Sequence, residues 1–105
     1  MKASINALSR EARVVTVQEQ VSCNLGDEVV VLQLRDGHYF GLNPVGASVW
    51  KLVQTPRTIG EIHRALLEEY AVEAEQCERD LLLLLQRMSA AGLVQISHEQ
   101  DQQNL

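Results

Sequence analysis

Residues 38–50, HYFGLNPVGASVW, join an aromatic extended run to a predicted helix, and the order of the fold follows from this joint. His38 to Leu42 has the aromatic content that is typical of strands. Asn43 is a favoured helix N-cap and Pro44 suits the first helical position, so we predict a helix from here to about Val53. The stretch is either a simple joint between a strand and a helix or an edge at which the protein binds a partner.

Two further extended runs, RVVTVQ (13–18) and EVVVLQLR (28–35), precede this joint. Both are rich in valine, which favours strands. The dipeptide Asp36-Gly37 predicts a two-residue type I′ turn between residues 28–35 and 38–42, because both residues of such a turn need positive φ. In that register Arg35 lies opposite His38, and strand 38–42 presents apolar groups on both faces.

Helical patterns fill the C-terminal half of the chain. A third helix is predicted from near Ala74 to the helix-stop residue Gly92, and residues 94–96 are expected to add a short extended segment. Thr58 and Glu61 form a capping box, which predicts the start of a second helix between these two parts. The buried stripe expected on that second helix consists of Ile59, Ile62, Leu66 and Tyr70.

Strands followed by helices predict an α+β fold. We expect a winged-helix-like domain, with an N-terminal three-stranded antiparallel sheet followed by three helices. We also predict three parts along the chain: a flexible N-terminal arm over residues 1–12, one domain over residues 13–96 and a disordered polar tail over residues 97–105. A length of 105 residues, 46% of them hydrophobic, suits one domain with a modest core.

Charge and composition exclude several functional classes. The formal net charge of −5 argues against nucleic acid as the main partner, since phosphate binding needs a positive surface; plain solubility also explains an acidic surface. The N-terminus lacks the apolar run of a secretory signal, and the leucine run 81–85 is far shorter than the ~20 residues of a membrane span. A cytoplasmic location is expected. Cys23 and Cys77 form no zinc-type motif, so we expect Cys77 to be a free buried thiol.

The third predicted helix carries apolar residues on two arcs. At ~100° per residue, one arc suits the core and contains Cys77, Leu81, Leu84, Leu85, Met88 and Ala91. Leucines on the opposite arc either pack on the sheet or on a second copy of the chain, or line a groove for an apolar side chain of a ligand. This second arc contains Arg79, Leu82, Leu83, Gln86 and Ala90.

The sequence offers no catalytic constellation. His38, His63 and His98 are scattered over three elements, and His63 at the margin of an apolar stripe is interpreted as structural. No serine, cysteine or histidine has the partners that nucleophilic catalysis needs at a recognisable spacing. We therefore expect a non-enzyme that needs no cofactor and no metal. The helix carboxylates are interpreted as a solvated face: Glu68, Glu69, Glu73, Glu75, Glu78 and Asp80.

Peptide binding remains attractive on physical grounds. If residues 38–42 form an edge strand, their free N–H and C=O groups can pair with an extended peptide as an added strand. Gly41 has no side chain, which lets another backbone approach closely. Main-chain bonds would give affinity, and side-chain pockets would give specificity.

Several marks in fixed order now identify a resemblance. They are the aromatic strand before Leu42-Asn43, Gly46 and Trp50, the Thr58/Glu61 box with Ile62, then Tyr70, Asp80 and Ala91-Gly92-Leu93. From about Val29 to Val94 the chain resembles the PqqD-like family. This family is named for a small protein of pyrroloquinoline quinone biosynthesis, and is also known as the precursor-peptide recognition element of ribosomally synthesised, modified peptides (RiPPs).

The resemblance implies a winged-helix-like fold that binds the leader region of a precursor peptide and presents it to modifying enzymes. In such proteins the leader adds as a strand in the cleft between the third strand and the third helix. Carried onto this chain, the implied peptide-binding residues of the strand are His38, Tyr39, Phe40, Gly41 and Leu42. Those of the helix are Arg79, Leu82, Leu83, Gln86 and Ala90.

The joint Leu42 to Gly46 looks more like the stand-alone members of lasso peptide pathways than like the quinone-pathway member. The implied partners are the leader peptide together with a leader peptidase and a cyclising enzyme; a radical enzyme is an alternative partner. Two other hypotheses stay open: a winged-helix DNA-binding regulator, and a structural subunit that forms a homodimer through the third helix. The first would need a basic recognition helix, yet the second helix carries Glu61, Glu68 and Glu69.

Overall fold

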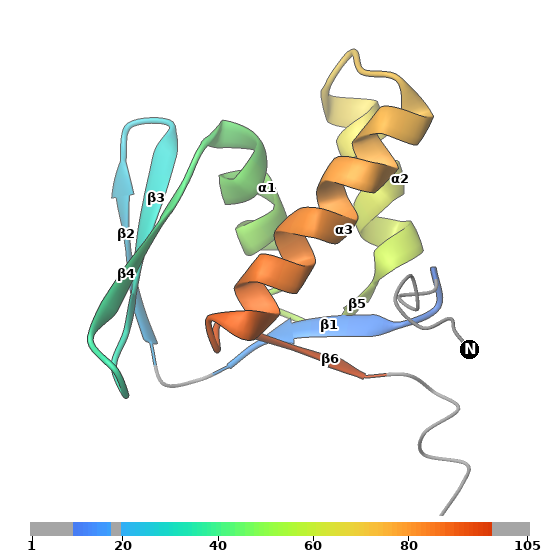
Figure 1. The fold of residues 1–105 in the computed structure, drawn as a ribbon. Coiled ribbons are helices and arrows are strands. Elements are labelled where there is room, and N and C mark those ends of the chain that lie inside the picture. The colour runs from blue at the N-terminus through green and yellow to red at the C-terminus, as the bar shows by residue number, and fades with distance from the viewer. Residues whose placement is uncertain (1–9, 18–19, 98–105) are drawn as a thin grey trace, which may run out of the picture.

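The computed structural model describes residues 10–17 and 20–97, most of which lie in helices and strands (Figure 1). The predicted α+β class, with a three-stranded antiparallel sheet followed by three helices, is confirmed. In chain order the elements are β1 (Arg13–Thr16), β2 (Gln20–Leu25), β3 (Glu28–Gln33), β4 (His38–Leu42), α1 (Pro44–Leu52), β5 (Arg57–Thr58), α2 (Ile59–Glu69), α3 (Ala74–Ala90) and β6 (Val94–Ser97).

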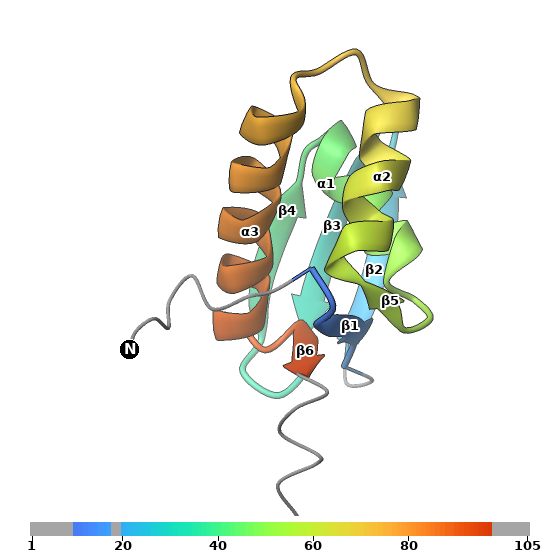
Figure 2. The same cartoon turned by 90° about the vertical axis from the view of Figure 1, so that its right-hand side faces the viewer.

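The strands belong to two antiparallel sheets. One has the order β2-β3-β4, and all three helices lie on one side of it (Figure 1). The other has the order β5-β1-β6 and joins the N-terminal strand to the strand that follows α3. Figure 2 shows α2 and α3 standing above this small sheet, with α1 and β4 between and behind them.

The three-stranded sheet is composed differently from the sequence prediction. The predicted run 13–18 does contain a strand, but β1 pairs with β5 and β6 and not with β3. The third member of the sheet is β2, a strand that the sequence analysis missed. Gln20–Leu25 has a single β-branched residue, Val21, and contains asparagine, which is depleted in strands, so it lacks the valine-rich signal of its neighbours.

The predicted type I′ turn at Asp36-Gly37 is wrong. His38 pairs with Gln33 across a four-residue loop, and only Gly37 has a positive φ, of 74°. Gln33 closes this loop twice: its carbonyl accepts from the Gly37 N–H at 2.8 Å, and its side-chain oxygen accepts from the Asp36 N–H at 2.7 Å. The register is shifted by two residues, so each side chain keeps the face that was predicted for it.

A two-residue turn does occur one hairpin earlier. Leu25 pairs with Glu28, which leaves Gly26-Asp27 as the connection between β2 and β3. Gly26 has φ of 68° while Asp27 does not have a positive φ, and a glycine at the first central position is what a type II′ turn requires.

The core lies between the inner face of the β2-β3-β4 sheet and the helices. Along β3, buried and half-buried residues alternate, with Val29, Val31 and Gln33 facing inward. The helices contribute the largest fully buried side chains, among them Ile59, Ile62, Leu66, Leu85 and Met88. The predicted stripe of α2 is confirmed for its first three members, and Tyr70 is half-buried.

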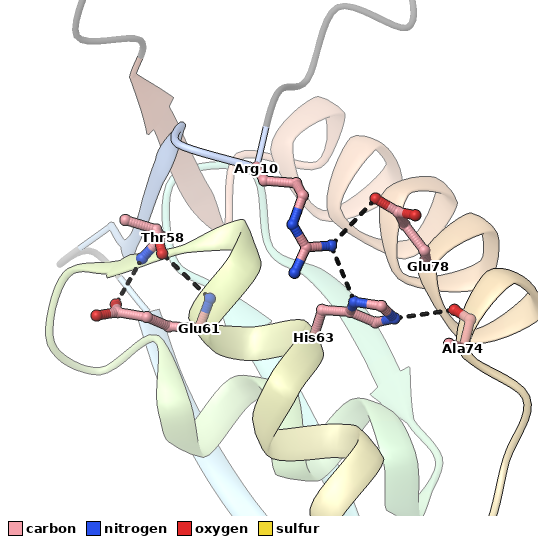
Figure 3. A network of polar contacts seen from close by, with 6 residues as sticks. All are labelled: Arg10, Thr58, Glu61, His63, Ala74 and Glu78. Atoms are coloured by element: carbon pink, nitrogen blue, oxygen red, sulfur yellow. Dashed lines mark hydrogen bonds and ion pairs between the residues drawn. The ribbon is translucent and has the colours of Figure 1, made fainter.

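The predicted helix starts are also confirmed. Asn43 caps α1, with its side-chain oxygen 2.8 Å from the Gly46 nitrogen, and Pro44 is the first helical residue. Thr58 and Glu61 form the reciprocal bonds of the capping box at α2, of 3.1 and 2.9 Å (Figure 3). The backbone leaves α3 through Gly92, whose φ is 79°.

The segment ahead of β1 is packed against α2. Ala12 is 1% exposed and its carbonyl accepts from the Ile59 N–H at 2.9 Å. Residues 10–12 of the predicted flexible arm are therefore attached to the domain, and Ser97 of the predicted tail is in β6. Residues 1–9 and 98–105, on which the rest of these two predictions falls, lie outside the described residues. Each helix in the described part of the chain is too short or too polar to cross a membrane.

We predict that Thr58→Ala lowers the free energy of unfolding by about 1 kcal/mol, because it removes the oxygen that accepts from the Glu61 N–H. Thr55→Ala is the matched control: this exposed threonine lies three residues earlier and outside the capping box, and its loss should change stability by less than about 0.5 kcal/mol. Urea denaturation of both variants measures the difference. Equal effects would contradict the role of the cap.

Candidate functional site

One edge of the β2-β3-β4 sheet is unpaired at β4. Its five residues pair with β3 on one side, and none of the described backbone groups bonds to its other side. In an antiparallel strand, alternate residues direct both N–H and C=O away from the partner strand. His38, Tyr39 and Gly41 are exposed, Phe40 is half-buried and Leu42 is buried, so the strand is anchored at its end and open along its length.

A cavity of about 430 Å³ opens between the three helices near the end of β4. This volume is within the range of ligand pockets. The lining is mostly apolar, and α3 supplies its longest wall. The residues of α3 that line it are Gln76, Cys77, Asp80, Leu81, Leu83, Leu84 and Arg87; the others are Asn43, Val45, Gly46, Val49, Leu66, Tyr70 and Val72.

Tyr70 fixes the wall opposite α3. Its hydroxyl is hydrogen-bonded to the Ser48 hydroxyl at 2.9 Å, and either hydroxyl can be the donor. The hydroxyl that accepts in this bond is free to donate to its own second acceptor, which lies at 3.3 Å in both cases: the Pro44 carbonyl for Tyr70 and a Glu69 carboxylate oxygen for Ser48. These contacts tie the end of α2 to the first turns of α1, so this side of the cavity is held by polar bonds as well as by packing.

Arg87 connects the cavity to β4. Its guanidinium carbon lies 5.8 Å from the centre of the Phe40 ring, within the range of a cation–π contact. Because Arg87 also lines the cavity, the contact places the aromatic side chain of the open strand beside the α3 wall. The edge of β4 and the cavity are therefore parts of one continuous surface.

The structure brings together only some of the site residues predicted from the sequence. Leu83 is 59% exposed and lines the cavity. Leu82, its neighbour, is half-buried and packs against the core. Arg79 donates to the side chain of Gln76 at 2.9 Å, and, like Gln86 and Ala90, it is exposed and lies outside the cavity lining.

Of the seven residues of α3 that line the cavity, only Leu83 was in the predicted site, and six were left out of it. Asp80, Leu84 and Arg87 are spaced at i, i+4 and i+7 and share one helix face. Leu84 was assigned to the core, and it is half-buried at the border between core and cavity. A helical wheel drawn from the sequence groups these residues on one face. That this face lines a cavity follows only from the position of α1 and β4 in the structure.

Other chemistry is not favoured by the described residues. Across residues 10–17 and 20–97, no group of three or more His, Cys, Asp or Glu side chains is placed to hold a metal ion. His63 is buried and bonded on both ring nitrogens, in agreement with the structural role predicted for it. On α2, Glu61, Glu68 and Glu69 are exposed, which is unfavourable for a recognition helix that must approach phosphates.

The two cysteines have different surroundings. Cys23 is exposed on β2, whereas Cys77 is half-buried in the cavity wall, and both are free. Desolvation raises the pKa of the Cys77 thiol, and the nearby carboxylate of Asp80 raises this pKa further. The thiol is therefore kept in its neutral, unreactive form at neutral pH.

We predict that iodoacetamide at pH 7.5 alkylates Cys23 well before Cys77, because the thiolate is the reactive form and burial limits access to Cys77. Mass spectrometry of peptides at timed intervals measures both rates. Asp80→Asn should speed the modification of Cys77 and leave Cys23 unchanged. Equal rates for the two thiols in the native chain would contradict the prediction.

Comparisons with known proteins agree with this geometry. Residues 28–94 match the family described as Coenzyme PQQ synthesis protein D (PqqD). A search of curated proteins finds no match. A solved structure of TbiB1 in complex with the TbiA(beta) leader peptide is 36% identical, with a TM-score of 0.72, over 77% of this chain and 94% of that one.

A second solved structure, of a lasso peptide synthetase B1 complexed with the leader peptide, superposes with a TM-score of 0.69. It covers 78% of this chain and 96% of the other at 23% identity, and so supports the fold. The family match extends from the start of β3 to the start of β6 and includes β4, α3 and the whole cavity between the helices. The chain therefore belongs to the PqqD family.

Proposed function

We propose that this protein recognises the leader region of a ribosomally made precursor peptide. The observation that carries the proposal is the unpaired edge of β4 beside an apolar cavity walled by α3. A leader in extended form would add to β4 as a fourth strand of the sheet, with its backbone bonded to the free groups of that edge. TbiB1, 36% identical over most of its length, is a protein whose structure contains a leader peptide, and this likeness supports the proposal.

The cavity gives the proposed interaction its specificity. Alternate side chains of an added strand point toward the same side as the helices, where the cavity lies. Its lining is mostly apolar, with Leu83, Leu84 and Val45 among its members, so an apolar side chain of the leader is the complementary group. Arg87 and Asp80 supply charged groups at the same wall for polar contacts with the peptide.

The proposed role is that of a non-catalytic partner in the cytoplasm, where ribosomal precursors are made. The bound peptide would be presented to maturation enzymes, and the lasso-type pathway, with a leader peptidase and a cyclising enzyme, is favoured. The joint from Leu42 to Gly46, which resembles that of the stand-alone members of lasso peptide pathways, supports this choice. A radical enzyme as the partner stays an alternative.

The two other hypotheses are weaker on the geometry. A DNA-binding regulator would have to bring the acidic exposed face of α2 to phosphates. The second arc of α3 offers a homodimer less exposed apolar surface than the sequence predicted. Leu82 packs inward, and of the two leucines only Leu83 is well exposed. Light scattering of the purified chain measures its oligomeric state directly.

We predict that binding of the leader slows amide hydrogen exchange along β4 and leaves the other sheet edge, β2, unchanged. The added strand would cover the free N–H groups of β4, whereas β2 lies on the far side of β3. Exchange is measured by NMR or mass spectrometry with and without the native leader, taken from a short precursor identified among the neighbouring reading frames. Protection of β2 instead of β4 would contradict strand addition at this edge.

We predict that Leu83→Glu weakens leader binding by about tenfold or more and leaves the fold intact, because the new charge enters an apolar cavity wall from an exposed position. Gln86→Glu is the matched control, since it adds the same charge to the same helix outside the cavity lining. Leu82→Glu, in contrast, should lower stability, because Leu82 packs against the core.

Fluorescence polarisation with the labelled native leader measures these affinities, and circular dichroism verifies the fold. The labelled TbiA(beta) leader is a useful second probe, because it is the peptide held by the 36% identical relative. The unsubstituted chain should bind its native leader with micromolar or tighter affinity. An absence of binding to that leader would overturn the proposed function.

A further inference from the structure

Arg10 links the N-terminal segment to both α2 and α3 (Figure 3). Its Nη1 lies 3.0 Å from Nδ1 of His63 on α2 and 3.3 Å from Oε2 of Glu78 on α3. Its backbone carbonyl accepts a hydrogen bond of 2.9 Å from the Gly60 N–H at the start of α2. A single residue therefore contacts two of the helices that line the cavity.

The positions of the protons in this network follow from its donors and acceptors. Nε2 of His63 lies 2.9 Å from the carbonyl oxygen of Ala74, the first residue of α3. A carbonyl only accepts and a guanidinium only donates, so Nε2 carries the ring proton and Nδ1 accepts from Arg10. The ring, which is 5% exposed, is therefore neutral when the network is closed.

A second proton on the ring is incompatible with this arrangement. It would occupy Nδ1 and face the N–H of Arg10, so that two donors and two positive charges would meet. Among the charged groups, Arg10 faces the ring from the N-terminal segment, and the carboxylate of Glu78 on α3 bonds to the same Nη1 of Arg10 that contacts the ring. Protonation of the ring would therefore open the contact between Arg10 and His63.

The network holds the part of α3 that forms the cavity. Ala74 begins the helix and Glu78 lies one turn later, while Gln76, Cys77 and Asp80 of the same turns line the cavity. The opposite wall includes Leu66 and Tyr70 of α2. The position of α3 against α2 therefore sets the shape of the cavity.

We propose that Arg10 and His63 form a proton-sensitive latch that positions α3 for peptide binding. The latch is closed while His63 is neutral and opens as the pH falls. Arg10 acts as a positioning residue, through His63 and Glu78 and without contact to the peptide. The effect on affinity rests on the proposed function, whereas the opening of the latch is a property of the free protein.

The test uses the full chain with His38→Gln and His98→Gln, so that His63 is the one histidine left of the three. In the free protein, NMR follows the His63 ring and the Gly60 amide from pH 7.5 to 5.5. The Gly60 amide should titrate together with the ring, and Arg10→Ala should abolish this coupled change. Arg13→Ala, which removes an exposed arginine three residues later in the same segment, is the control and should leave the coupling intact.

Affinity for the labelled native leader is measured in the same background. We expect about three- to tenfold weaker binding at pH 5.5 than at pH 7.5. Arg10→Ala should weaken binding by a similar factor at pH 7.5 and lose most of the pH dependence, and Arg10→Lys should recover part of the affinity.

Two results would overturn the latch. One is a Gly60 amide that does not follow the ring; the other is an Arg10→Ala chain that binds as tightly as the background at pH 7.5 or keeps its full pH dependence. If the unsubstituted chain binds no leader at either pH, the proposed function fails, and the NMR titration of the free protein still decides the latch. Arg10 is half exposed, at 51% of its side chain, so its loss should leave the fold intact.

Discussion

The rest of the structure depends on the helix cap at Asn43, which turns the chain from β4 directly into α1. The side chain of Asn43 accepts from the Gly46 N–H, and Pro44 starts the helix without a linker. A Cβ on Gly46 would lie 3.2 to 3.3 Å from atoms of Leu42 and Asn43, so a larger residue would crowd this turn. The cap thereby holds α1 against the inner face of the sheet and beside the end of β4.

One consequence is that the sheet is covered on one side only and β4 stays at its edge. α1 follows β4 too closely for another strand to form between them, and α2 and α3 pack on the same side as α1 (Figure 1). The free edge therefore lies beside the helices. Arg87 over Phe40 is the contact that joins the two, and the cavity lies between α1 and α3.

The site could be predicted from the sequence as a pair of elements but not as a set of side chains. The aromatic strand and the leucine-rich helix were both identified. Leu82 and Leu83 were assigned to one face, yet one packs on the core and the other lines the cavity, since they are ~100° apart on the helix. Asp80 and Arg87 look like solvated charges in the sequence, and only the nearby α1 and β4 make them part of a wall.

The β2-β3-β4 sheet is a second case in which the sequence predicted the elements but not the contacts between them. The predicted register was wrong by two residues, yet each side chain of β3 and β4 stayed on the face that it was given, because side chains alternate with a period of two. Both faces of the hairpin carry apolar residues, so which face points inward was decided by the position of the helices. The register itself depends on Gln33, whose side chain closes the four-residue loop. β1 reads as a strand in the sequence, but its partners β5 and β6 are distant along the chain.

The sequence by itself determined the local features: the caps at Asn43 and Thr58, the helix stop at Gly92, and the presence of β1, β3 and β4 ahead of three helices. These depend on residues a few positions apart, whose hydrogen bonds and φ values are fixed locally. Tertiary structure alone decided which strands share a sheet, which arc of α3 lines the cavity and that Arg10 reaches His63 and Glu78. These contacts join residues far apart in the chain, so packing of the whole domain selects them.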